Sequence, residues 1–310
     1  MSDAKLFRLV QNSVQELKSS SVAVEKSLQT LIEQHLDVFL GVRCLASEYS
    51  TGKNHGGRID TLGIDENGSP VIIEYKRALN ENVINQGLFY LDWLMDHRAD
   101  FKLLVIDRYG KHAGDEIDWS APRLICIAGD FTKYDEYATK QINRSIELIR
   151  YRRYGNEFLL LELVNATSTD ANNHDGTKKA ATGTSSGSKN APGRTIVERL
   201  NQAPTDVRDR YEALKASLFA LGDDVQMKEV KNYFAFRRIK NFACVEIHPQ
   251  LKRISIYLKV DPEKVALEPG FTRDVRKVGH FGTGDLEVTV DTDEALERAR
   301  PLILKSYEAS

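Results

Sequence analysis

The chain has 310 residues, a formal net charge of −2 and 41% hydrophobic residues, which is enough apolar sequence for one large domain or two ordinary ones. This near-neutral balance excludes a protein that is basic throughout, so any surface for nucleic acid must be local. No run of about 18 apolar residues occurs, and the N-terminus lacks the apolar core of a signal peptide, so we expect neither a membrane span nor secretion. The three cysteines, Cys44, Cys126 and Cys244, are too scattered for a zinc site or a disulfide framework. Each is expected to be a small buried residue of a cytoplasmic protein.

Apolar residues recur alternately at helical and at strand spacing along the first half of the chain. In chain order, the patterns predict helices at 5–18 and 23–39, strands at 43–49, 58–65 and 70–76, a helix at 82–97, strands at 101–107 and 123–128, a helix at 132–149 and a strand at 157–164. This order is typical of an α/β fold in which helices flank a mixed sheet. We therefore expect one domain over residues 1–167.

Residues 168–194 contain no Leu, Ile, Val, Met or aromatic residue. Such a segment buries too little apolar surface to offset the entropy of ordering, so it predicts a flexible linker. Beyond it, the patterns predict a helix at 195–221, strands at 231–237, 242–248, 253–260 and 285–290, and a helix at 293–308. Residues 195–310 are therefore expected to form a small α+β domain on an antiparallel sheet.

Charged residues gather on two neighbouring strands of the first domain. Asp60 lies in the strand 58–65, and Glu74 and Lys76 lie in the strand 70–76. A two-residue turn at 67–68 would set Asp60 opposite Tyr75, on the wrong side of the sheet. A three-residue loop at 66–68, with Gly68 in the left-handed conformation, sets Asp60 opposite Glu74. We favour the second register because it brings the charged groups together.

Two carboxylates on one face repel each other unless a cation lies between them, and hard oxygen ligands suit Mg²⁺ or Mn²⁺. Glu74 and Lys76 share a strand face, so a lysine would lie beside that ion and could act on water or phosphate. The alternative is a solvated Glu–Lys pair. The apolar run at 71–73 indicates a strand buried on both faces, where charges are unusual. The residues alone leave both interpretations open.

The helices on either side of these strands carry further candidates. Gln86 and Tyr90 are four residues apart and share a face of the helix 82–97, although a polar-edged core would give the same pattern. In the helix 23–39, Glu25 lies ~60° from the centre of the apolar stripe and Glu33 ~140° away. We therefore expect Glu25 to face the sheet and Glu33 to face solvent. A helix-start carboxylate favoured by the dipole is the alternative for Glu25.

Together, Arg58-Ile59-Asp60 and Glu74-Tyr75-Lys76 resemble the core of the PD-(D/E)xK nucleases, with the greatest likeness to the RecB-like catalytic domains of NucS-type endonucleases. The resemblance covers residues 25–105 well and extends loosely to 165. It implies a restriction-endonuclease-like fold in which Asp60, Glu74, the Tyr75 carbonyl and Glu25 bind metal, Lys76 acts on the nucleophile, and Gln86 and Tyr90 complete the site.

Two departures limit what the resemblance implies. Ile59 stands where the motif has proline. The separate N-terminal DNA-binding domain of NucS-type enzymes has no counterpart, so specificity for mismatched or branched DNA is not carried over. The second half resembles a small bacterial domain of unknown function, through residues 278–285 and 302–307. That likeness implies no activity.

Basic residues suggest where nucleic acid would be contacted. Residues 228–259 hold eight Lys or Arg against two acidic residues, with aromatic residues between them. A basic sheet with aromatic residues can hold a strand, but an amphipathic sheet with its aromatics in the core has the same composition. A second cluster at 144–153 is a phosphate contact, a solvated helix end or a set of caps for carbonyl groups at a helix C-terminus. The expected contacts are Arg58, Arg144, Arg150, Arg152, Arg153, Arg237, Arg238 and Lys240.

We therefore expect a metal-dependent nuclease that hydrolyses phosphodiester bonds, with Mg²⁺ or Mn²⁺ as cofactor and nucleic acid, by preference DNA, as partner, in repair or defence. A catalytically silent nucleic-acid-binding or regulatory protein with this fold is the alternative, and a homodimer is left open.

Overall fold

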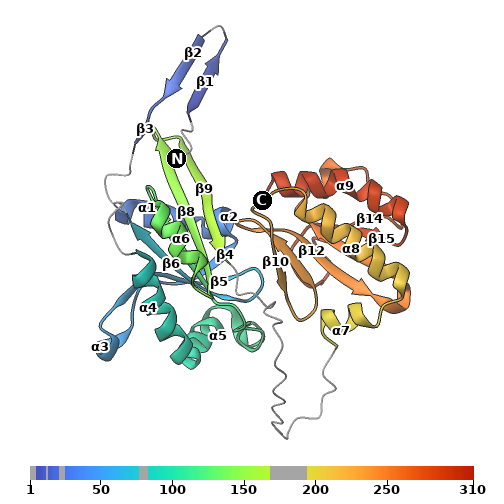
Figure 1. Ribbon diagram of the computed structural model, residues 1–310, viewed down its shortest axis with the longest axis horizontal. Coiled ribbons are helices and arrows are strands. Elements are labelled where there is room, and N and C mark those ends of the chain that lie inside the picture. The colour runs from blue at the N-terminus through green and yellow to red at the C-terminus, as the bar shows by residue number, and fades with distance from the viewer. Residues whose placement is uncertain (1–4, 12, 21–24, 77–82, 168–193) are drawn as a thin grey trace, which may run out of the picture. The chain divides into compact units, whose positions relative to one another are not determined.

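The computed structural model describes residues 5–11, 13–20, 25–76, 83–167 and 194–310 (Figure 1). The chain divides into two compact units, residues 1–168 with 238–240, and residues 169–237 with 241–310. The expected linker at 168–194 lies outside the described residues, apart from its last residue. In the described part of the chain, no helix combines the length and the apolar character needed to cross a bilayer.

A seven-stranded mixed sheet forms the centre of the first unit. Its order is β3 (Ser19–Ser20), β8 (Ser145–Tyr154), β7 (Arg123–Ala128), β6 (Pro70–Lys76), β5 (Arg58–Asp65) and β4 (Val42–Ser50), with β9 (Phe158–Thr167) also paired to β8. The pairs β6–β7 and β7–β8 are parallel, whereas the pairs on either side are antiparallel. The predicted mixed sheet is confirmed.

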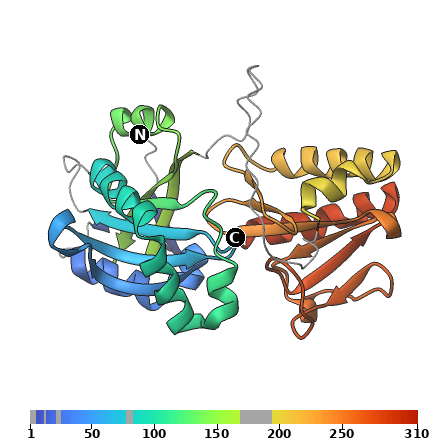
Figure 2. The same cartoon turned by 90° about the horizontal axis from the view of Figure 1, so that it is seen from below.

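Helices cover both faces of this sheet (Figure 2). They are α1 (Glu25–Gln34), α2 (Leu36–Leu40), α4 (Val83–Asp96), α5 (Arg98–Asp115) and α6 (Lys133–Lys140), with the short α3 (Gly52–His55) between β4 and β5. Val71 and Ile73 of β6 pack into the core under α1 and α2, and Ile72 packs into the core under α4 and α5. Both faces of β6 are buried, which is why its sequence is apolar at consecutive positions.

Three predicted elements of the first unit are wrong. Residues 5–18 form the hairpin β1 (Leu6–Val10) and β2 (Ser13–Leu17), not a helix (Figure 1). Residues 101–107 belong to α5, because Phe101 and Val105 are buried one helical turn apart. The predicted helix 132–149 ends at Lys140, and β8 begins at Ser145. A short apolar run fits the helical period as well as the strand period, and tertiary packing decides which structure forms.

The second unit is an antiparallel sheet with its helices packed into one core, as predicted. The strand order is β10 (Gln226–Glu229), β11 (Phe234–Arg237), β12 (Asn241–His248), β13 (Arg253–Leu258), β15 (Leu286–Val290) and β14 (Thr272–Asp274). Short 3₁₀ turns lie at Pro249–Leu251 and Pro262–Lys264. In Figure 2 the yellow-orange α8 (Thr205–Phe219) and the red α9 (Asp293–Glu308) lie on one side of the sheet. The predicted helix 195–221 is divided at Pro204 into α7 (Ile196–Asn201) and α8.

A buried ion triad ties the β5–β6 loop to the middle of the sheet. Arg123, only 3% exposed, donates from Nε and Nη2 to the two carboxylate oxygens of Glu147 at 2.8 Å each, and from Nη1 to Asp65 at 3.0 Å. The other oxygen of Asp65 accepts from the N–H groups of Asn67 at 2.9 Å and Ser69 at 2.8 Å. The conformation of this loop therefore depends on a carboxylate that Arg123 neutralises.

Replacing Arg123 by Met should lower the free energy of unfolding of the first unit by about 3–5 kcal/mol, because two carboxylates are left buried without their cation. Urea unfolding followed by tryptophan fluorescence reports this unit alone, since both tryptophans, Trp93 and Trp119, lie in it. The control is Lys102→Met, whose exposed pair with Asp115 should change the free energy of unfolding little. Equal losses in the two variants would contradict a structural role for the triad.

Candidate functional site

The register of the β5–β6 hairpin is the one that gathers the charged residues. Thr61 lies opposite Ile73 and Ile64 opposite Pro70, and the same register places Asp60 opposite Glu74. The Asp65 N–H donates to the Ser69 carbonyl at 2.9 Å, and Gly68 has a φ of 80°. The prediction of a three-residue loop with a left-handed Gly68 is confirmed.

The two carboxylates are linked through the backbone of the opposite strand. Glu74 Oε1 accepts from the Asp60 N–H at 3.2 Å, and Asp60 Oδ2 accepts from the Tyr75 N–H at 3.0 Å. Glu74 is 0% exposed, whereas Asp60 is half-buried. Because residues directly opposite each other share a sheet face, the pair lies together at the edge of the α4-covered face.

Helix α4 contacts the buried carboxylate of Glu74 through a side-chain hydrogen bond. Gln86 Nε2 donates to Glu74 Oε2 at 2.8 Å and lies 3.4 Å from the Tyr90 hydroxyl. That hydroxyl accepts from the Arg58 N–H at 3.2 Å. Gly57 is required here, since a Cβ on it would lie 2.4 Å from Cε1 of Tyr90. The predicted shared face of Gln86 and Tyr90 is confirmed, and it points at Glu74.

The charge of Asp60 is poorly compensated within the protein. Burial raises the pKa of its carboxyl above the ordinary value, and the negative charge of Glu48 adds to this. The Tyr75 N–H and the positive charges of Lys76 and Arg58 act in the opposite direction but do not cancel the effect of burial on the pKa. A further cation beside Asp60 would favour its ionised form.

Helix α1 meets the strands differently from the prediction. Gln29, which is buried, donates to the Asp60 carbonyl at 2.8 Å and to Glu33 at 3.0 Å. Glu33 is half-buried and accepts from the Thr61 hydroxyl at 2.5 Å, so the expectation that it faces solvent is wrong. The helix ends at Gln34, and burial of Gln29 widens its inner face towards Glu33. The side chain of Glu25 lies outside the described residues, so its role stays a prediction.

Glu48 is a neighbour of the site that sequence reasoning missed. It lies in β4 between the paired positions Ser47–Thr61 and Tyr49–Ile59, beside Asp60, with a left-handed φ of 53°. Its carboxylate binds Lys26 Nζ at 2.6 Å and Arg58 Nε at 2.5 Å. The hydrogen bond from Lys26 is the main cause that lowers the pKa of Glu48. No local pattern marks this residue, because its placement depends on how β4 pairs with β5.

The donor set fits a cation with few protein ligands. Among the described residues, no three His, Cys, Asp or Glu side chains are grouped to hold a metal ion. Mg²⁺ commonly uses one or two carboxylates and completes its shell with water and substrate phosphate. Asp60 and Glu74 are the two carboxylates that such a site would use. The Tyr75 carbonyl and Glu25 are the further ligands that the sequence predicts.

The basic cluster of the first unit is only partly available to a ligand. It lies on β8 and in the turn before it, not at a helix end. Arg150 is buried between Asp130 at 2.7 Å and Glu162 at 3.1 Å, so the predicted phosphate contact is wrong for this residue. Arg153 donates to the Gly155 carbonyl at 3.1 Å. Arg152 is half-buried, whereas the side chains of Arg144 and Arg58 are exposed.

The predicted basic, aromatic surface of the second unit is not formed as expected. Phe234, Phe236 and Phe242 lie in the core beneath the helices, which is the alternative interpretation of the pattern. Arg237 is 4% exposed and cannot meet a strand, so this predicted contact is wrong. Arg238 and Lys240 are half-buried, and they belong to the segment 238–240, which groups with the first unit.

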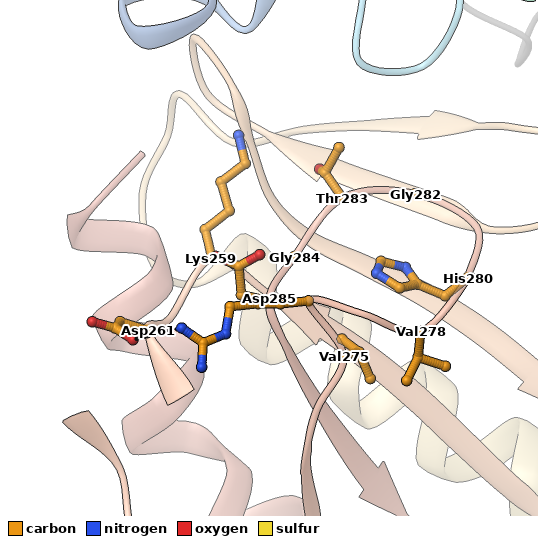
Figure 3. Close-up of a pocket in the computed structure, with 10 residues that line it drawn as sticks. Lys259, Asp261, Val275, Val278, His280, Gly282, Thr283, Gly284 and Asp285 are labelled. Carbon is orange, nitrogen blue, oxygen red and sulfur yellow. Dashed lines mark ion pairs between the residues drawn. The ribbon is translucent and has the colours of Figure 1, made fainter. Parts of the chain in front are cut away.

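The second unit has a cavity of about 490 Å³ under the loop 279–285 (Figure 3). His280 stacks on Tyr257 with ring centres 4.3 Å apart. Gly284 has a φ of 143°, and a Cβ on it would lie 2.6 Å from the Leu258 nitrogen, so the close approach of the β13 backbone explains this glycine. The lining mixes Lys259 and Arg276 with Asp261 and Asp285, and this mixture selects no ligand charge.

Replacing Asp60 by Asn should make the metal-free first unit more stable at neutral pH. The folded-state pKa of Asp60 lies above its ordinary value, so ionisation destabilises the fold above that pKa, and this penalty disappears as the pH falls through it. The amide retains an oxygen for the Tyr75 N–H. Thermal unfolding in EDTA, followed by tryptophan fluorescence, should show a higher Tm at pH 7 and a shrinking gain in acid. A lower Tm at pH 7 would contradict the assigned cause.

The comparisons with known proteins fall into two groups. Residues 196–310 match the model of a domain of unknown function, DUF5655, which agrees with the resemblance of the second half. An uncharacterized protein of Haemophilus influenzae is 29% identical over 309 residues, covering 98% of this chain and 99% of the relative.

Two solved structures are similar to part of the chain. A repair endonuclease from Pyrococcus abyssi is 20% identical over 44% of this chain, with a TM-score of 0.29. A structure of an EndoMS–dsDNA complex is 16% identical over 47% of this chain, with a TM-score of 0.25. The matched regions span 50% and 64% of those two chains.

Proposed function

We propose that the first unit is a metal-dependent phosphodiesterase that hydrolyses nucleic acid, by preference DNA, with Mg²⁺ or Mn²⁺ as cofactor. The observation that carries this proposal is the hydrogen-bonded pair of Asp60 and Glu74 at the edge of the sheet. Lys76 is two residues beyond Glu74 on the same strand face, and its charge acts on Asp60.

Asp60 and Glu74 would hold the cation, together with the Tyr75 carbonyl and Glu25. A divalent ion supplies Lewis-acid polarisation of a phosphate oxygen. Lys76 would orient the attacking water and donate to the charge that develops on phosphate. Gln86 is a positioning residue in this scheme, because its bond to Glu74 Oε2 leaves Oε1 on the side of Asp60.

Hydrogen bonds within the protein hold these groups in position. Tyr90 connects Gln86 to the backbone at Arg58, two residues before Asp60. Thr51 joins the two ends of the β4–β5 connection, since its hydroxyl and the Gly57 backbone are 2.9 Å apart. Such preorganisation is what electrostatic stabilisation of a transition state requires.

One observation favours a second candidate, a nucleic-acid-binding or regulatory protein without catalysis. Glu74 is 0% exposed, and each of its oxygens already accepts a hydrogen bond from the protein. A buried carboxylate in this state can serve the fold alone. Metal binding and cleavage separate the two candidates.

Replacing Lys76 by Ala should reduce cleavage by on the order of 10²–10³-fold and leave Mn²⁺ affinity nearly unchanged, because the lysine acts on the rate. Replacing Asp60 by Asn should remove both, because the amide keeps the shape but loses the charge that binds the cation. The measurements are Mn²⁺ titration calorimetry and cleavage of labelled single- and double-stranded DNA and RNA with Mg²⁺, Mn²⁺ or EDTA.

Lys102→Ala, an exposed lysine of α5, is the matched control and should behave as wild type. Full cleavage by Lys76→Ala together with wild-type Mn²⁺ affinity in Asp60→Asn would contradict the proposal that the protein is an enzyme. Binding of nucleic acid without cleavage under every condition would favour the second candidate.

A further inference from the structure

An aromatic pair of a half-buried histidine and an exposed phenylalanine lies near the Asp60–Glu74 site. His55, the last residue of α3, stacks on Phe89 of α4 with ring centres 3.9 Å apart and an angle of 21° between the rings. His55 Nε2 is also 3.2 Å from the Phe89 carbonyl, so a hydrogen bond and ring stacking both join the two residues. Phe89 is nevertheless 46% exposed. A single exposed phenylalanine is ordinary, but one held flat against an imidazole is an ordered stacking surface.

The pair is anchored to the residues that form the site. Phe89 precedes Tyr90 and follows Gln86 by three residues, so it lies less than one helical turn from the side chain that holds Glu74. The backbone around His55 is closed by hydrogen bonds, since the Gly56 N–H donates to the Gly52 carbonyl at 2.9 Å and the Thr51 hydroxyl is 2.9 Å from the Gly57 backbone. A ring stacked on Phe89 would therefore belong to a nucleotide close to the reacting phosphate.

The charge of the same loop suits a nucleic-acid backbone. Residues 51–58 include Lys53, His55 and Arg58 and no acidic residue. Lys53 is exposed, and Arg58 pairs with Glu48 while its side chain stays 67% exposed. The neighbouring helix α4 adds one exposed negative charge, that of Asp92, one turn beyond Phe89. A basic loop next to an exposed aromatic face is the arrangement that binds single strands.

We propose that Phe89 and His55 form a stacking platform for one unpaired base of a nucleic-acid strand, and that Lys53 contacts the adjoining phosphate. The proposal rests on the proposed function and adds where the strand lies at that site. Stacking is tolerant of sequence because every base has a π face, so this surface selects unpaired strands rather than a sequence.

The test uses the full chain in EDTA, so that binding is measured without cleavage. The probes are a single-stranded oligonucleotide carrying 2-aminopurine and a blunt duplex of the same sequence. Phe89→Leu keeps an apolar side chain and removes the ring. It should weaken single-strand binding roughly 5- to 150-fold, the range for loss of one stacked base, abolish the 2-aminopurine quenching, and change duplex binding little. Phe158→Leu, on β9, is the matched control because Phe158 is also 46% exposed.

Lys53→Ala should lower the slope of log affinity against log salt by about one, without loss of the quenching. If Phe89→Leu is not folded, judged by tryptophan fluorescence, His55→Ala removes the other half of the pair and should weaken single-strand binding in the same direction. Wild-type quenching and affinity in Phe89→Leu or in His55→Ala would overturn the platform while cleavage and the Lys76→Ala result still support the nuclease. A wild-type protein that neither binds nor cleaves any strand would overturn the proposed function first.

Discussion

The carboxylate of Asp65 is the constraint on which the candidate site depends. One of its oxygens holds the N–H groups of the β5–β6 loop, and the other meets Arg123, which Glu147 also binds. The loop conformation sets the pairing of β5 with β6, and that pairing decides which side chains of β5 share a face with Glu74. A buried charge network at one end of the strands thus determines the chemistry available at the other end.

At that other end the electrostatic balance is incomplete. The backbone N–H groups of Asp60 and Tyr75 and the amide of Gln86 hold the two carboxylates in place, but burial raises the pKa of Asp60 above its ordinary value. Functional sites often keep such an uncompensated charge where a ligand supplies the remainder. At Asp60 that ligand would be a cation, whereas the basic loop at 51–58 and the exposed ring of Phe89 suit a polyanion.

Sequence predicted the parts of the fold whose signals are local. The bounds of β5, β6 and β7 match because turn residues and continuous apolar runs mark them, and the Asn67-Gly68 pair indicated the hairpin. The phase of α1 was predicted from an apolar stripe that included Phe39, but α1 ends before that residue, so Glu33 was misplaced. Glu48 and the burial of Arg150 depend on partners far along the chain, and no local pattern carries that information.

The three-residue loop between β5 and β6 has a genetic consequence. Removal of a single codon at 66–68 would preserve the reading frame, the hydrophobic pattern and nearly all of the composition. The shortened connection would pair the strands one residue out of step and turn Asp60 to the opposite side of the sheet from Glu74. Natural selection on a functional Asp60–Glu74 pair would therefore act on the length of this loop more strongly than on the identity of most of its residues. Related sequences would show substitutions at 66–68 but no insertions or deletions.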